Sequence, residues 1–230
     1  MAGPPTLALV HSPLVGPMTW VPAAEGLRDR GFPVAVCSPA GGPPYYPRMA
    51  EAAARSVAGT GDVVLVGHSG AGALLPAIAD VLGGRVRGAV FVDALLPHPG
   101  SSWFDTAPEP LREHLTALVR DGRLPPWNEW FPADAIEALL PDAEVRERFV
   151  GELPRLPIAY FEEPAPAPAG WTGVGCHYVR LSEAYDRAAD EAQRRGWTVV
   201  REDADHLAPL TRPERISDLI ARVTRTPEPG

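Results

Sequence analysis

A serine at an abrupt transition from strand to helix constrains the fold of this chain more than any other feature. An apolar run at residues 63–66 leads into small residues around Ser69, and an alanine-rich helical pattern then continues to about Asp80. A short apolar run with turn signals at both ends is typical of a buried parallel strand. A turn this sharp holds Ser69 in a strained backbone conformation, with its hydroxyl at the carboxyl end of the sheet. The stretch therefore predicts a nucleophilic serine.

The residues around the serine are small enough for such a turn. Nucleophilic serines of this kind usually lie in the pattern G-x-S-x-G. In this chain Gly67 occupies the first position and Ala71 the fifth, with Gly70 and Gly72 on either side of the alanine. Because alanine still allows a helix to approach the strand closely, we expect the turn to form.

Length, charge and cysteine content limit the class of protein. A chain of 230 residues fits one domain, and a net charge of −8 argues against nucleic acid or an anionic membrane as a partner, because both favour a basic surface. Cys37 and Cys176 are too few for a disulfide framework, which favours buried free thiols in a reducing compartment. The chain begins without a basic leader and has no apolar stretch of membrane-spanning length. We therefore expect a cytoplasmic protein, either a monomer or a homodimer.

Strand and helix patterns alternate along most of the chain. Such alternation predicts an α/β fold with a doubly wound, mostly parallel sheet of about six strands and right-handed crossovers. Strands are predicted at 6–11, 32–37, 63–66, 86–93, 177–181 and 197–201. Helices are predicted at 19–30 with Thr19 as the N-cap, at 49–58, after Ser69, at 185–195 and from 212 or 213 to about 223.

The alternation is interrupted at residues 94–175. This segment has no clear strand pattern, is rich in proline and shows helical patterns at 109–119, 133–140 and 143–153. A structureless loop of this length would be unusual. We therefore predict a helical cap, inserted after the fourth strand, over the carboxyl ends of the strands. Its tryptophans either wall a substrate pocket or seal the cap against the sheet, and the candidates for the pocket are Trp103, Trp127 and Trp130.

A serine hydroxyl is a weak nucleophile unless a base removes its proton and a third group orients that base. When the serine lies at such a turn, the acid follows in the chain and the histidine comes after the last strand. His206 is the only one of six histidines between the last predicted strand and the terminal helix. It is therefore the predicted general base.

Three carboxyl groups are candidates for the orienting acid. Asp186 fits the spacing after strand 177–181 best if the turn is one residue longer than usual, and Glu183 fits without that residue. Asp93, at the end of strand 86–93, is the third candidate, because related folds sometimes place the acid there. At least two of the three must instead cap a helix or close a loop.

Hydrolysis also needs two N–H donors for the oxygen that becomes negative. Gly70 supplies one, and the other normally follows a His-Gly pair at the end of the first strand. This chain has His11, Ser12 and Pro13 there, and proline has no N–H. The Ser12 hydroxyl and the Leu14 N–H are the local substitutes; otherwise the second donor comes from elsewhere or is missing. A lost donor costs about 2.7–4 kcal/mol of transition-state stabilisation, which argues against an ordinary esterase.

With these parts in place, the chain resembles the α/β-hydrolase superfamily along nearly its whole length. It is most similar to the small capped branch that contains plant methylesterases and hydroxynitrile lyases. The matching stretches are residues 9–11 followed by Trp20, the nucleophile elbow at 67–69, residues 91–97, and residues 205–206 before the last helix. The resemblance implies an active site without cofactor or metal, in which Ser69 is the nucleophile, His206 the base and Asp186 or Glu183 the acid. It also implies a small, largely apolar substrate under the cap.

Three functions are compatible with these observations. The first is a serine hydrolase that cleaves a carboxylic ester, thioester or lactone of a small hydrophobic molecule. The second is a lyase, cyclase or isomerase in which Ser69 and His206 only move protons, and Pro13 motivates it. The third is a small-molecule receptor that kept the pocket and lost the chemistry.

Overall fold

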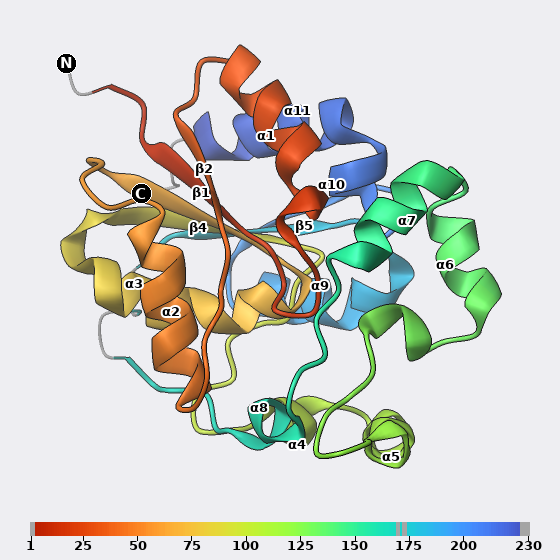
Figure 1. Ribbon diagram of the computed structural model, residues 1–230. Coiled ribbons are helices and arrows are strands. Elements are labelled where there is room, and N and C mark those ends of the chain that lie inside the picture. The colour runs from red at the N-terminus through yellow and green to blue at the C-terminus, as the bar shows by residue number, and fades with distance from the viewer. Residues whose placement is uncertain (1–2, 169–170, 172–173, 226–230) are drawn as a thin grey trace.

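Six parallel strands form a twisted sheet with helices on both faces (Figure 1). The computed structural model describes residues 3–168, 171 and 174–225. The strand order is β2-β1-β3-β4-β5-β6, which confirms the predicted doubly wound α/β fold. The strands are β1 (Thr6–Val10), β2 (Val34–Cys37), β3 (Val63–His68), β4 (Val86–Val92), β5 (Cys176–Arg180) and β6 (Thr198–Arg201).

The central strands are buried on both faces, as their continuous apolar runs predict. Every residue of β1 and β3 is buried. Successive side chains alternate between two cores, so that Leu7 and Leu9 pack beneath one helical layer and Ala8 and Val10 beneath the other. The first layer contains α1 (Val21–Asp29) and α11 (Pro213–Arg225), and the second contains α2 (Tyr45–Arg55), α3 (Leu75–Leu82) and α9 (Asp186–Arg194).

Two helices begin elsewhere than predicted. Thr19 does not cap α1, because it lies in a short 3₁₀ turn, η1 (Pro17–Thr19), and its hydroxyl donates to the Gly16 carbonyl. Helix α2 begins at Tyr45 instead of residue 49. The Glu163 carboxylate accepts hydrogen bonds from the Tyr45 and Tyr46 N–H groups at 2.8 and 2.9 Å, which satisfies donors at the start of this helix. A cap supplied from so far along the chain leaves no local sequence signal.

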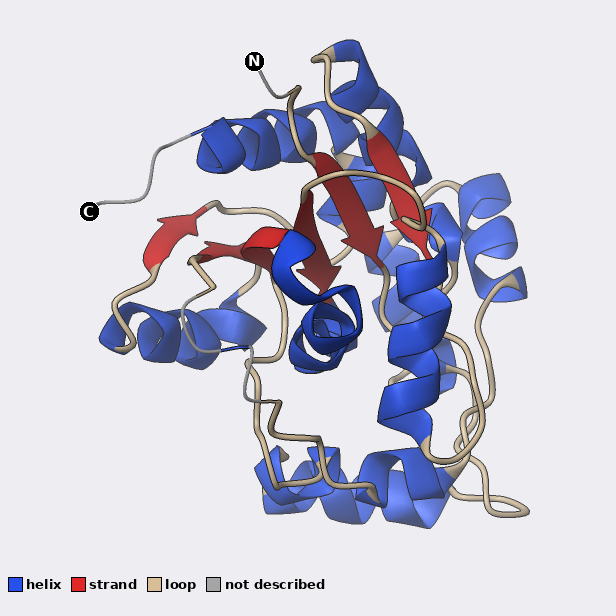
Figure 2. Ribbon diagram, turned by 90° about the vertical axis from the view of Figure 1, so that its left-hand side faces the viewer, coloured by secondary structure: helices blue, strands red, loops and turns tan. Residues whose placement is uncertain are grey.

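Between β4 and β5 the described residues form helices and loops. In Figure 2 the arrowheads of the central strands point toward the lower helices of this segment, which Figure 1 labels α4, α5 and α8. The helices predicted at 109–119, 133–140 and 143–153 are present, and two short helices were not predicted. The helices are α4 (Trp103–Thr106), α5 (Glu109–Leu118), α6 (Ala133–Leu139), α7 (Ala143–Gly151) and α8 (Ile158–Glu162). In the described part of the chain, no helix has both the length and the apolarity needed to span a membrane.

Candidate active site

Ser69 lies at the turn where β3 passes directly into a 3₁₀ helix, η2 (Ser69–Leu74), and then into α3. Its φ angle of 55° falls in the left-handed region, which residues with a side chain rarely adopt. The Leu95 N–H donates to the Ser69 carbonyl at 3.0 Å and helps to hold this conformation. The strained turn predicted from the sequence is therefore confirmed.

Small residues make this turn possible. A Cβ atom on Gly67 would lie 3.0 Å from the Leu75 side chain, and one on Gly72 would overlap the Leu95 carbonyl oxygen. Ala71 is fully buried and fits at the fifth position of the motif. Gly72 is thus the residue at which the chain after β4 approaches the helix too closely for any side chain.

His206 follows β6 and is held by a buried carboxylate. Its Nδ1 lies 2.8 Å from Asp93 Oδ2. Because a carboxylate accepts hydrogen bonds, the imidazole proton belongs on Nδ1, which leaves Nε2 with a free lone pair. This is the tautomer that a general base needs.

Asp93 is fully buried at the end of β4. It accepts hydrogen bonds from Leu181 N–H at 2.8 Å, Ser182 N–H at 3.0 Å and the Ser182 hydroxyl at 2.6 Å. Burial on its own would raise the pKa of Asp93, but the hydrogen bonds from His206 and Ser182 outweigh it and lower that pKa. The carboxylate is therefore ionised beside the imidazole.

Of the three predicted acids, the structure brings Asp93 to the imidazole. Asp186 instead begins α9 and accepts from Arg180 Nε at 2.6 Å, so its expected contact with His206 is wrong. Glu183 is exposed at the start of η6 (Glu183–Tyr185). The turn after β5 instead donates hydrogen bonds to Asp93 from Leu181 and Ser182.

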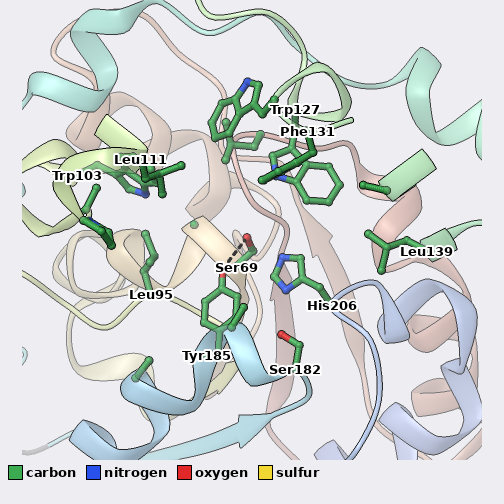
Figure 3. A pocket seen from close by; sticks show the side chains of 18 of the residues that line it. Ser69, Leu95, Trp103, Leu111, Trp127, Phe131, Leu139, Ser182, Tyr185 and His206 are labelled. Atoms are coloured by element: carbon green, nitrogen blue, oxygen red, sulfur yellow. Dashed lines mark hydrogen bonds between the residues drawn. The ribbon is translucent and has the colours of Figure 1, made fainter. Parts of the chain in front are cut away.

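Ser69 and His206 line one cavity of about 710 Å³ (Figure 3). The three tryptophans predicted as pocket walls also line it, although Trp130 is mostly buried and packs against Phe161 as well. Most of the remaining lining is apolar and comes from the segment between β4 and β5: Leu95, Ala107, Pro108, Leu111, Phe131, Ala135, Ile136 and Leu139. Among the described residues, no group of three His, Cys, Asp or Glu side chains is arranged to hold a metal ion.

Tyr185, which sequence reasoning did not select, touches both reacting residues. Its Oη lies 3.4 Å from Ser69 Oγ, and within the described residues this contact, not one to His206, is the hydrogen bond of Oγ. The tyrosine ring stacks on the His206 imidazole at 5.1 Å, with the planes 4° apart. The sequence signal for Tyr185 is its place in the turn after β5, where an acid was predicted.

His68 supports the loop that carries the base. It is fully buried, and its ring lies 4.6 Å from that of His206. His68 Nε2 donates to the His206 carbonyl at 2.8 Å. Burial, together with the neighbouring His206, lowers the pKa of His68 far below its usual value, so this ring is neutral.

The loop after β1 supplies fewer N–H donors than an oxyanion hole usually takes from it. Leu14 lines the cavity, but its N–H donates to Ser12 Oγ at 3.2 Å. Ser12 is fully buried, and His11 holds the loop by donating from Nδ1 to the Ser12 carbonyl and accepting from the Ser38 hydroxyl, both at 2.9 Å. Neither His11 nor Ser12, both predicted for substrate binding, lines the cavity. Gly70, the predicted first donor, does line it.

The profile of the alpha/beta hydrolase family matches residues 9–219. One similar structure is an extracellular alpha/beta-hydrolase from a Paenibacillus species, described as sharing structural and functional homology with tobacco salicylic acid binding protein 2. It is 19% identical, the match covers 97% of this chain and 100% of that chain, and the TM-score is 0.72. A pyrethroid hydrolase from Sphingobium faniae is 20% identical over 97% and 98%, with a TM-score of 0.71. A tomato methylketone synthase I variant bound to beta-ketoheptanoate is 13% identical over 97% and 98%, with a TM-score of 0.69. At such identities the likeness shows a shared fold, and a search of curated proteins gave no match.

Proposed function

Because the chain belongs to the alpha/beta hydrolase family, we propose that it is a serine hydrolase that cleaves a carboxylic ester, thioester or lactone of a small hydrophobic molecule. One observation carries the proposal. Ser69, on its strained turn, opens into the same cavity as an imidazole whose Nδ1 is held by a buried, ionised carboxylate. Such a site is suited to covalent catalysis by a serine.

In the proposed mechanism Ser69 Oγ attacks the carbonyl carbon while its proton passes to His206 Nε2. The carbonyl π electrons move onto oxygen, which the Gly70 N–H stabilises. Asp93 stays ionised and stabilises the imidazolium through its contact with Nδ1. His206 then gives the proton to the leaving oxygen or sulfur, and a water molecule activated by the same imidazole releases the acyl group from Ser69.

The shape and chemistry of the cavity support a small apolar substrate. A volume of about 710 Å³ lies in the ordinary range for small-molecule sites. In the proposal, the described residues of the segment 94–175 form a cap that covers the site and supplies most of its apolar wall, including Trp103 and Trp127. Among the described residues that line the cavity, Arg187 is the one with a permanent charge, and it is exposed.

The loop after β1 favours a second candidate function. Pro13 has no N–H and the Leu14 N–H is already bound to Ser12, so neither residue supplies a second N–H donor for an oxyanion. A lyase, cyclase or isomerase that forms no acyl-enzyme would depend less on an oxyanion hole. In that case the natural substrate would be turned over without an acyl group ever forming on Ser69, whereas a hydrolase would form that acyl-enzyme.

A series of p-nitrophenyl esters tests the proposed function. We expect the wild-type protein to hydrolyse the acetate and hexanoate esters, because a cavity of about 710 Å³ with a mostly apolar wall accommodates short acyl chains. The matched control is the Ser69→Ala variant, which should release p-nitrophenol no faster than buffer. Wild-type rates that equal those of this variant for every ester would contradict the proposal.

A further inference from the structure

Tyr185 is placed to act on the serine and the base together. Its hydroxyl lies 3.4 Å from Ser69 Oγ (Figure 3). Its ring is stacked with the His206 imidazole, with the centroids 5.1 Å and the planes 4° apart. It also lines the cavity that both side chains share. Among the described residues, no other side chain contacts both the Oγ atom and the imidazole ring.

The position of the acid explains how a tyrosine reaches this place. Because Asp93 on β4 holds the imidazole, the turn after β5 does not supply a carboxylate. Instead Leu181 and Ser182 donate hydrogen bonds to Asp93. These bonds anchor the start of η6, and Tyr185 at the end of this 3₁₀ turn projects toward the serine. The same carboxylate thus holds His206 directly and Tyr185 through the backbone.

The state of the phenol decides what its hydroxyl can do. Burial raises the pKa of Tyr185 well above its usual value, and the group therefore keeps its proton at neutral pH. A protonated phenol can donate to a lone pair of Ser69 Oγ. The proton of Ser69 is then directed away from Tyr185 and toward His206 Nε2, the lone pair that the Asp93 contact leaves free.

We propose that Tyr185 is a catalytic residue that donates a hydrogen bond to Ser69 Oγ during nucleophilic attack while its ring holds the imidazole in place. This inference rests on the proposed function. As Oγ bonds to the carbonyl carbon, the Ser69 proton passes to His206 Nε2 and the carbonyl π electrons move onto oxygen. Tyr185 keeps its own proton throughout and stabilises the partial negative charge that Oγ carries while its proton is leaving and its bond to carbon is still forming.

The rate at which a fluorophosphonate modifies Ser69, followed by intact protein mass, tests this role. Hydrogen bonds to charged groups contribute about 1.5–3 kcal/mol, so the Tyr185→Phe variant, which keeps the ring, should react about 10- to 100-fold more slowly than wild type. A Tyr185→Leu variant loses the stack too and should react more slowly still. Tyr46→Phe is the matched control, because Tyr46 is also buried but does not line the cavity. It should react at the wild-type rate.

A second measurement separates the hydroxyl from general damage. Thermal melting should show that the Phe variant folds, and its kcat for p-nitrophenyl hexanoate should fall with little change in KM, since the hydroxyl acts on Oγ and not on the acyl chain. A folded Tyr185→Phe variant that reacts as fast as wild type would overturn the inference alone. A wild-type protein that takes up no phosphonate would overturn the proposed function and this inference with it.

Discussion

Replacing Asp93 by asparagine should lower kcat for a p-nitrophenyl ester by about 10⁴-fold while the fold is retained. The reason is the proton on the imidazole. An asparagine can present its NH₂ group to His206 Nδ1, which would place the ring proton on Nε2, where it blocks acceptance of the Ser69 proton. The variant also removes the negative charge that stabilises the imidazolium. Steady-state kinetics together with a circular dichroism spectrum would measure the effect.

Asp186→Asn is the matched control for this prediction. Asp186 was the acid favoured by spacing, but its carboxylate pairs with Arg180 at 2.6 Å on the surface side of α9. We therefore expect kcat to stay near the wild-type value. If Asp186→Asn proved the more damaging of the two, the assignment of Asp93 as the partner of the imidazole would be refuted.

The largest expected effect on stability comes from Gly72→Ala. The new Cβ would overlap the Leu95 carbonyl oxygen and lie 3.0 Å from the Ala94 Cβ. Leu95 cannot move away freely, because its N–H is bonded to the Ser69 carbonyl. Overpacking of this kind typically costs 1–3 kcal/mol, and with backbone as the obstacle we expect about 3 kcal/mol.

Urea denaturation measures this loss, and Gly84→Ala serves as its control. A Cβ on Gly84 would meet no atom within 4 Å, so its free energy of unfolding should change by less than about 0.5 kcal/mol. Equal midpoints for the two variants would show that the approach of Leu95 to Gly72 is not a constraint on the fold.

Features encoded by neighbouring residues could be predicted from the sequence. The buried runs of β1 and β3, the small residues around Ser69 and the position of His206 between the last strand and the last helix are local patterns, and the structure has all of them. The three longer helices between β4 and β5 carry enough turns for an apolar period to show. Helices α4 and α8 have only four and five residues, which is too short for an apolar period to show.

Features that depend on contacts distant in sequence could not be predicted. The start of α2 depends on Glu163, which lies more than a hundred residues away. The choice among Asp93, Glu183 and Asp186 depends on which carboxylate meets the imidazole in space, and spacing along the chain does not give that contact. Tyr185 was missed for a related reason, since its importance comes from the two side chains it meets in space.

The account depends most on Ser69 being acylated with His206 as its base. The most direct measurement is to mix the protein with p-nitrophenyl hexanoate, quench it in acid within the first turnovers and map the added mass on peptides. We predict a hexanoyl group on the peptide that contains Ser69, and none in a His206→Ala variant treated for the same time. Rapid release of p-nitrophenol by wild-type protein with no acyl group on Ser69, or with the group on another residue, would contradict the account.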